Sequence, residues 1–365
     1  MHTDIIQEAF FELLRAGLWE KEARLSQYNS IDYAAISQMA EEQCVVGLVT
    51  AGVEHVVGAQ VPKEDVLQFV GQALQLEQSN KAMNEYLARL IERLRKDDVY
   101  ALLVKGQGIA QCYEKPLWRA SGDIDLLLSD TNYEKAKQVL LPLAVSVENE
   151  YKTFKHLGLT MPGGYVVELH GTLHSRLSKR VDKVIDEAQK DVFYGGNVRS
   201  WLNGRTSVFL PSPDNDIIFV FTHILHHYYI EGIGLRQICD WCRLLWEYRS
   251  EINVSLLEQR LRKAGLMSEW QAFAALAVDW LGIPVDAMPF YSSEKKWSRK
   301  AERIIAFVLE CGNFGHNRQA AAGKISSAWY KIRDFARHSL VFPWDSIKFF
   351  FHFMGDGITL AANKQ

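Results

Sequence analysis

The amino-acid sequence predicts an α+β fold in which a small mixed-sheet core is flanked by N-terminal and C-terminal helical regions. Three observations predict it. From residue 4 to about residue 98, apolar side chains recur every three or four positions, which is typical of amphipathic helices. The middle of the chain then changes to short apolar runs of strand length, separated by glycine turns. From residue 213 onward the helical spacing returns.

At 365 residues the chain exceeds the usual size of a single domain, so several packed units are expected. The changes in apolar spacing place the boundaries. We expect an N-terminal helical region at residues 1–97, an α/β core at residues 98–212 and a C-terminal helical region at residues 213–365.

The core opens with a continuous apolar run at residues 99–104, which predicts a buried strand. It stops at Lys105-Gly106-Gln107-Gly108, a glycine turn, and residues 109–113 follow as a short helix. A second strand is expected at residues 123–128 and a second helix at residues 133–141. These elements predict a strand, turn and helix unit that leads into a second strand.

Two further runs, residues 155–161 and 165–169, flank Pro162-Gly163-Gly164. A turn signal between two strand-like runs predicts a β-hairpin. Another strand is expected at residues 207–210. Proline and aspartate at the start of the next segment then predict a long helix that begins at about residue 213 and continues to residue 229.

Acidic side chains interrupt two of the predicted strands. Because residues two apart in a strand point to the same face, Asp123 and Asp125 project side by side. Adjacent carboxylates repel, and a hard cation such as Mg²⁺ compensates for such a pair. Glu168 interrupts the second hairpin strand and completes a set of three carboxylates if that strand lies beside the first. His170 shares its face and is expected to support the site.

The composition limits the classes of partner. The 41 Lys and Arg against 44 Asp and Glu leave a formal charge of −3. The overall charge therefore does not indicate electrostatic attraction to nucleic acid or to a membrane surface. Five scattered cysteines argue against a disulfide framework and suit a reducing cytoplasm. The N-terminus lacks a secretory pattern. The apolar stretch at residues 341–354 is shorter than the roughly 20 residues of a membrane span.

These motifs together resemble an uncharacterised bacterial nucleotidyltransferase family within the polymerase-β-like superfamily. The resemblance rests on Lys105-Gly106 after a strand, on the run from Arg119 and Ser121 through Asp123-Ile124-Asp125, and on Val167-Glu168-Leu169-His170. A later helical segment around residues 213–240 is also similar. The resemblance covers roughly residues 85 to 320.

The resemblance implies that the carboxylates bind Mg²⁺, as two ions or with Mn²⁺ in its place, and that the glycine turn holds a nucleoside triphosphate such as ATP. The residues expected at the nucleotide are Lys105, Gly106, Gln107, Gly108, Arg119, Ser121 and Arg236. The turn departs from the superfamily, which commonly has Gly-Ser or Gly-Gly. Because Gln107 supplies no hydroxyl, backbone N–H groups would hold more of the phosphate.

Three functions remain open at this stage. The first is transfer of a nucleoside monophosphate from the triphosphate to a hydroxyl-type acceptor, a small molecule or a protein, with Asp123, Asp125 and Glu168 as metal-binding and catalytic residues. The second is a metal-dependent glycosyltransferase that uses a nucleotide-sugar. The third is a non-catalytic nucleotide-binding module. The sequence leaves the roles of three helical histidines undecided: His223, His226 and His227.

Overall fold

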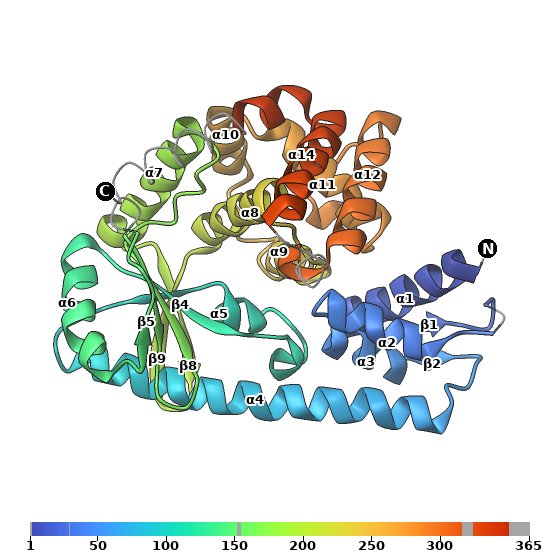
Figure 1. Cartoon of the computed structure of the whole chain (residues 1–365), viewed down its shortest axis with the longest axis horizontal. Helices are drawn as coiled ribbons and strands as arrows, with labels where there is room; N and C mark the ends of the chain where they lie inside the picture. Colours follow the sequence, from blue (N-terminus) through green and yellow to red (C-terminus); the bar gives the residue numbers. More distant parts are fainter. Residues whose placement is uncertain (1, 29, 152–154, 316–323, 350–365) are drawn as a thin grey trace.

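The structure is a computed structural model that describes residues 2–28, 30–151, 155–315 and 324–349. Its architecture confirms the α+β class: a seven-stranded mixed sheet lies between a long helix on one side and a group of C-terminal helices on the other (Figure 1). A second group of helices, from the N-terminal part of the chain, lies at the far end of the long helix.

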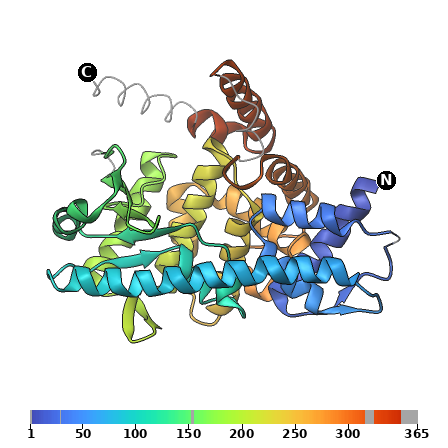
Figure 2. The ribbon, with the colours of Figure 1, turned by 60° about the horizontal axis from the view of Figure 1, so that its bottom comes forward.

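The N-terminal elements are α1 (His2–Trp19), β1 (Ala23–Arg24), α2 (Tyr33–Glu42), α3 (Val46–Glu54), β2 (Val56–Val57) and α4 (Lys63–Arg95). The two short strands pair in parallel, an addition to the helices expected there. With 33 residues, α4 is about 50 Å long at the usual helical rise. Figure 2 shows it crossing the molecule from the N-terminal helices to the sheet.

The sheet has the order β5-β6-β7-β4-β3-β9-β8. Its strands are β3 (Leu102–Val104), β4 (Asp123–Leu127), β5 (Ser146–Val147), β6 (His156–Thr160), β7 (Val166–His170), β8 (Val198–Asn203) and β9 (Thr206–Pro211). Two neighbouring pairs, β4 with β7 and β3 with β9, are parallel, and the other pairs are antiparallel. The sheet is therefore mixed, and β4 and β3 lie near its centre.

Between the strands lie α5 (Gly106–Ala110), η1 (Pro116–Trp118), α6 (Asp130–Leu140), η2 (Leu141–Leu143) and α7 (Lys179–Gly195). The C-terminal elements are α8 (Pro213–Ile230), α9 (Leu235–Glu247), α10 (Val254–Ala264), α11 (Met267–Asp279), η4 (Val285–Ala287), α12 (Lys295–Cys311), η5 (Asn313–Gly315) and α14 (Lys324–Val341). The predicted long helix after residue 212 is α8.

The two faces of the sheet differ in chemistry because strand residues alternate between them. Ile124 and Leu126 of β4 and Val167 and Leu169 of β7 point to one face, where they join a buried apolar cluster with α4 and α6. The intervening residues point to the opposite face. That face carries the acidic side chains, and α8 lies over it.

The N-terminal helices pack on the C-terminal ones in one continuous apolar core. Phe11 of α1 makes an edge contact with Trp280, their ring centroids 5.2 Å apart. The indole of Trp19 contacts Trp246 at 5.8 Å and donates a hydrogen bond to the carbonyl of Leu281. The regions that flank the sheet in sequence thus stabilise each other in space, while the three-part division of the chain stays a prediction.

Several elements differ from the sequence prediction in extent. The strand expected at residues 99–104 is limited to β3, because Asp98 has a positive φ of 54° and the chain turns there. The hairpin is present, with Gly163 and Gly164 at φ of 87° and 80° in its turn. Helix α7 and strand β8 were not predicted. The apolar spacing of Val181, Val184, Ile185 and Ala188 is typical of an amphipathic helix and was sufficient to predict α7. Strand β8 alternates exposed and half-buried residues and gave no such signal.

Among the helices that the structure describes, none has the length and apolar character needed to cross a membrane. Of the apolar stretch at residues 341–354, residues 350–354 lie outside the described part of the chain. Cys239 and Cys242 are buried in α9 as unpaired thiols, in agreement with a packing role.

Glu269 of α11 is completely buried, and this predicts a pH dependence of stability. Burial, and then the neighbouring Asp345, raises the pKa of Glu269 to about 8, against an ordinary value of 4.5. The hydroxyl of Tyr229 donates to its carboxyl group at 3.3 Å, and Lys300 opposes the shift. The folded state therefore keeps a proton that the unfolded chain loses above pH 4.5.

This contribution to stability is fully present below pH 4.5 and is lost as the pH rises to about 8. We expect Glu269→Gln, which stays neutral, to gain stability relative to the unmodified protein by up to several kcal/mol, at ~1.4 kcal/mol per pKa unit. Urea unfolding from pH 5 to 8.5 measures the difference. The exposed Glu302→Gln is the matched control, and a constant difference between Glu269→Gln and the unmodified protein across that range would contradict the prediction.

Candidate active site

Three carboxylates meet where β4 and β7 pair. The strands are parallel with Asp125 opposite Glu168, so the sheet places these two side chains next to each other on one face. Asp123 lies two residues before Asp125 on the same face. Oxygen atoms of all three lie within 4.8 Å of one another. The structure therefore brings together the three acids that the sequence singled out.

Three cationic or hydrogen-bonding groups contact this cluster. Lys105 follows β3 with a positive φ of 58°, and its Nζ lies 3.0 Å from Asp125 Oδ1. Nε2 of His170 lies 2.7 Å from the same oxygen and 3.3 Å from Glu168 Oε2. His156 of β6 contacts Glu168 Oε2 from the other side at 3.1 Å. Asp125 and Glu168 thus each have polar partners.

The pKa values follow from this arrangement. The negative charge of Asp125, and then burial, raises the pKa of Asp123. Burial acts in the same direction on Asp125, but Lys105 and the His170 contact outweigh it and lower the pKa of Asp125. Burial is likewise outweighed at Glu168, where the two imidazoles hold the pKa far below its ordinary range. Repulsion therefore remains concentrated at Asp123.

The donor set fits a hard divalent cation. All three groups offer carboxylate oxygens, which Mg²⁺ and Mn²⁺ prefer over softer ligands. Asp125 is only 3% exposed, so water screens the three charges poorly. A bound cation would relieve the repulsion that raises the pKa of Asp123. Asp123, Asp125 and Glu168 are the residues that would hold it.

A pocket of about 250 Å³ opens on the carboxylates between the sheet and helices α8 and α9. Four of the residues expected at the nucleotide line it: Lys105, Gly106, Arg119 and Arg236. All three carboxylates, Asp123, Asp125 and Glu168, line it as well. The pocket thus combines the acidic cluster with basic side chains.

Most of the glycine turn faces away from this pocket. Gln107 is 2% exposed, and its amide contacts the sulfur of Met83 on α4. Gly108 packs on β9, where an added Cβ would come within 2.7 Å of a Leu210 methyl. Of Gly106, Gln107 and Gly108, only Gly106, with φ of 45°, lines the pocket. The second glycine therefore serves close packing, and Gln107 contacts α4.

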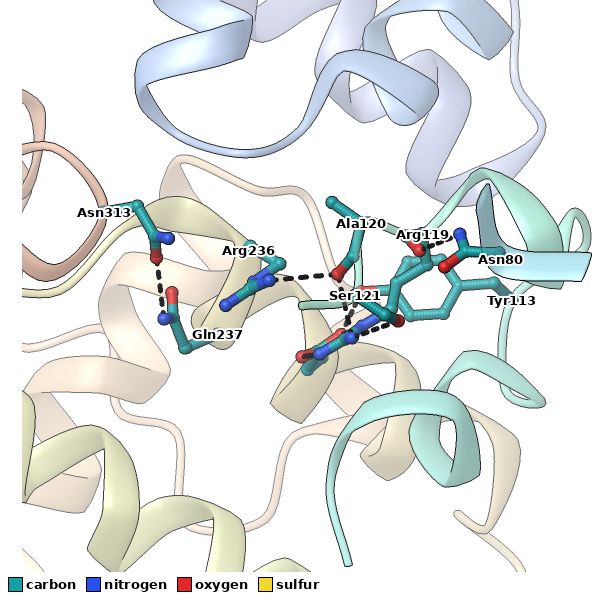
Figure 3. A network of polar contacts seen from close by, with 9 residues as sticks. Asn80, Tyr113, Arg119, Ala120, Ser121, Arg236, Gln237 and Asn313 are labelled. Carbon is teal, nitrogen blue, oxygen red and sulfur yellow. Dashed lines mark hydrogen bonds and ion pairs between the residues drawn. The ribbon is translucent and has the colours of Figure 1, made fainter. Parts of the chain in front are cut away.

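Arg119 forms a buried ion pair with Asp240 of α9. Its Nε and Nη2 donate to the two carboxylate oxygens of Asp240 at 3.0 and 2.5 Å, and Tyr113 donates to the same group at 2.8 Å. Nη1 donates to Ser121 Oγ at 2.9 Å, so Ser121 serves this network and does not line the pocket. Figure 3 shows the guanidinium of Arg119 inside the network. Arg119 is held by protein groups.

The backbone just before β4 is fixed from two directions. Asn80 of α4 donates to the carbonyls of Leu117 and Arg119, both at 2.8 Å. Arg236 of α9 donates to the carbonyl of Ala120 at 3.0 Å (Figure 3). Burial, and then the charge of Arg119, lowers the pKa of Arg236. An anion in the pocket would therefore be favourable beside Arg236.

The histidines of α8 lie between two cavities. A second cavity of about 360 Å³ adjoins the first, and both are lined by Lys105, Glu168 and His223. Burial, and then the charge of Lys105, lowers the pKa of His223 well below its ordinary value, so its ring is neutral. Nδ1 of His226 donates a hydrogen bond to the carbonyl of Ser175, and His226 lines the second cavity only.

Sequence reasoning missed three groups that shape the site. Asp240 lies four residues after Arg236 on α9, a spacing that suggests a pair within the helix, but it binds Arg119 from a distant segment. Asn80 and His156 gave no signal. Asn80 stands alone in a long helix, and His156 becomes informative only when the hairpin register places it opposite His170.

Comparison with known proteins agrees with this geometry. The model of an uncharacterised nucleotidyltransferase family matches residues 29–282, which is more than half of the chain. This chain belongs to that family. No curated protein and no solved structure matches it. The match includes the carboxylates, the pocket and the Arg119–Asp240 pair, and it confirms the resemblance found in the sequence.

The Arg119–Asp240 pair predicts a strong effect on stability. Asp240→Ala leaves the guanidinium buried without its carboxylate, so we expect a loss of about 3–5 kcal/mol in unfolding free energy. Glu258→Ala removes the exposed partner of Arg262 and should cost less than about 1 kcal/mol. Denaturant unfolding measures both, and equal losses would show that the buried pair has no special role.

Proposed function

We propose that this protein is a Mg²⁺-dependent nucleotidyltransferase that moves a nucleoside monophosphate from a nucleoside triphosphate to a hydroxyl-type acceptor. The observation that carries the proposal is the register of β4 and β7, which gathers Asp123, Asp125 and Glu168 at the floor of one pocket. A cation bound there supplies a positive charge for the phosphoryl group that is transferred. Family membership agrees with the reaction class.

Basic side chains in the pocket suit the phosphates. Lys105 and Arg236 both line it, within one space of about 250 Å³. Phosphate oxygens accept hydrogen bonds from ammonium and guanidinium groups, and these charge-assisted bonds are strong. Arg119 has its donors directed at Asp240, Ala120 and Ser121. We therefore assign phosphate contact to Lys105, Gly106 and Arg236, and a positioning role to Arg119.

The low pKa of Glu168 favours one role for this residue, binding a cation, over another, accepting a proton. A carboxylate that imidazoles keep ionised binds a cation well but accepts a proton poorly. Glu168 is therefore better suited to hold a cation than to deprotonate the acceptor. The second cavity, which is also lined by Glu168 but not by Arg236, provides the space for the acceptor.

The two alternatives are separable. A metal-dependent glycosyltransferase finds no support in the family match, and UDP-sugars should then bind no better than UDP alone. A non-catalytic nucleotide-binding module is motivated by the turn, where Gln107 contacts Met83 and only Gly106 lines the pocket. Metal-dependent binding of a nucleoside triphosphate without transfer to any acceptor would identify that module.

Asp123→Asn combined with Asp125→Asn tests the reaction. We expect no transfer of labelled nucleoside monophosphate to a panel of sugars, polyols, peptides and the protein itself, because the charge that holds the cation is removed. The double variant removes the repulsion between the two carboxylates but also the partner of Lys105, so circular dichroism and thermal unfolding check that it is folded. Asp130→Asn, at an exposed ion pair with Lys155, is the matched control. Undiminished transfer by the double variant would refute the mechanism.

Arg236→Gln tests the phosphate side. We expect triphosphate affinity to fall about 10-fold or more, which is the effect of losing one charge-assisted hydrogen bond. Mg²⁺ affinity should stay unchanged, because the carboxylates are intact. Calorimetric titration with a non-hydrolysable triphosphate and with Mg²⁺ alone measures both. Arg249→Gln, on an exposed side chain beyond α9, is the control. Equal triphosphate affinity in the two variants would show that Arg236 does not contact the triphosphate.

A further inference from the structure

Two histidines lie directly opposite each other on β6 and β7. His156 and His170 are register partners in the antiparallel pair, so both side chains leave the same face of the sheet. Glu168 precedes His170 by two residues and shares that face. The two imidazole rings are stacked, with centroids 4.8 Å apart. The sheet thus builds a second ligand cluster beside the carboxylates, with two imidazoles and one carboxylate.

The donor atoms of this cluster converge on a small volume. Nε2 of His156 and Nε2 of His170 lie 3.1 and 3.3 Å from one oxygen of Glu168. Zinc-like ions bind imidazole nitrogen and carboxylate oxygen at about 2.0–2.2 Å, which separates neighbouring ligands of a tetrahedral site by about 3.3 Å. Both separations are close to this spacing. The ligand atoms of all three residues lie within 4.8 Å of one another, so one ion can reach them after a small shift of the imidazoles.

We propose that His156, Glu168 and His170 form a binding site for a divalent transition-metal ion of the Zn²⁺ class. Imidazole nitrogen favours such ions, whereas Mg²⁺ prefers oxygen ligands alone. The cavity of about 360 Å³ is lined by all three residues and leaves the remaining coordination position to water or a small ligand. This site shares Glu168 with the Asp123 and Asp125 cation site but adds two imidazole ligands, and it does not depend on the proposed transfer reaction.

A second group of potential ligands, His226, His227 and Glu231, is less suitable. His226 and His227 are adjacent on α8, so their side chains leave the helix in different directions. Nδ1 of His226 is bonded to the carbonyl of Ser175 at 2.6 Å, and Nδ1 of His227 is bonded to Glu231 at 2.9 Å. The side chain of Glu231 is 51% exposed. His156, Glu168 and His170 have the more buried side chains, and both imidazoles contact the same carboxylate oxygen.

Titration with Co²⁺ in the presence of saturating Mg²⁺ tests the proposal on the full chain. Co²⁺ bound in a tetrahedral site absorbs visible light much more strongly than Co²⁺ in water, so the spectrum reports coordination without any activity assay. We expect one equivalent to bind to the unmodified protein. Affinity should fall at least 10-fold in His156→Ala and in His156→Gln. His174→Ala, at another histidine of the same cavity that pairs with Asp186, should bind normally.

His156→Gln separates metal binding from simple support of Glu168. A glutamine amide can still donate a hydrogen bond to the carboxylate but does not replace imidazole as a ligand. Unchanged Co²⁺ affinity in His156→Gln would overturn the proposal, as would the absence of a bound ion in the unmodified protein. Loss of the ion in Asp123→Asn with retention in His156→Ala would also overturn it. Thermal unfolding of each variant verifies that it is folded. The Co²⁺ spectrum does not depend on nucleotide transfer, so failure of the proposed reaction would leave this test unaffected.

Discussion

Repulsion among three buried carboxylates is the constraint on which the rest of the site depends. The register of β4 with β7 fixes Asp123, Asp125 and Glu168 on one face, where they cannot move apart without breaking the ladder between the strands. Lys105 and His170 offset the charge at Asp125 and Glu168, and this leaves Asp123 with a raised pKa beside the open pocket. The place where negative charge is least compensated is thus the place that a cation or a ligand can reach.

The helices on either side of the sheet hold this arrangement by different means. On the apolar face, α4 and α6 bury the residues that alternate with the acids. Just before β4, Asp240 of α9 binds the side chain of Arg119, and Asn80 of α4 donates to the backbone carbonyl of the same residue. The segment that leads into β4 is therefore fixed by one helix from the N-terminal part of the chain and one from the C-terminal part. Their shared core keeps those two anchors in place.

Much of this could be predicted from the sequence, for identifiable reasons. The alternation of acidic and apolar residues at 123–126 and 166–170 predicted which side chains share a face, and a proline-glycine turn predicted the hairpin. The rest depends on contacts between distant segments. The choice of Arg119 over Arg236 by Asp240, the packing of Gln107 on Met83, and the position of His156 opposite His170 require the folded topology. A sequence read by local spacing contains no signal for these pairings.

The polar face of the sheet changes in ligand chemistry from strand to strand. β4 offers only carboxylates there, β7 offers one carboxylate and one imidazole, and β6 offers an imidazole. Hard cations favour carboxylate ligands, and borderline transition metals favour imidazole ligands. Glu168 lies between the two kinds and contacts both imidazoles, so ions bound according to the two proposals would share it. Occupancy at His156 and His170 would then alter the charge available to a cation at Asp123 and Asp125, and the strand order itself would couple the two sites.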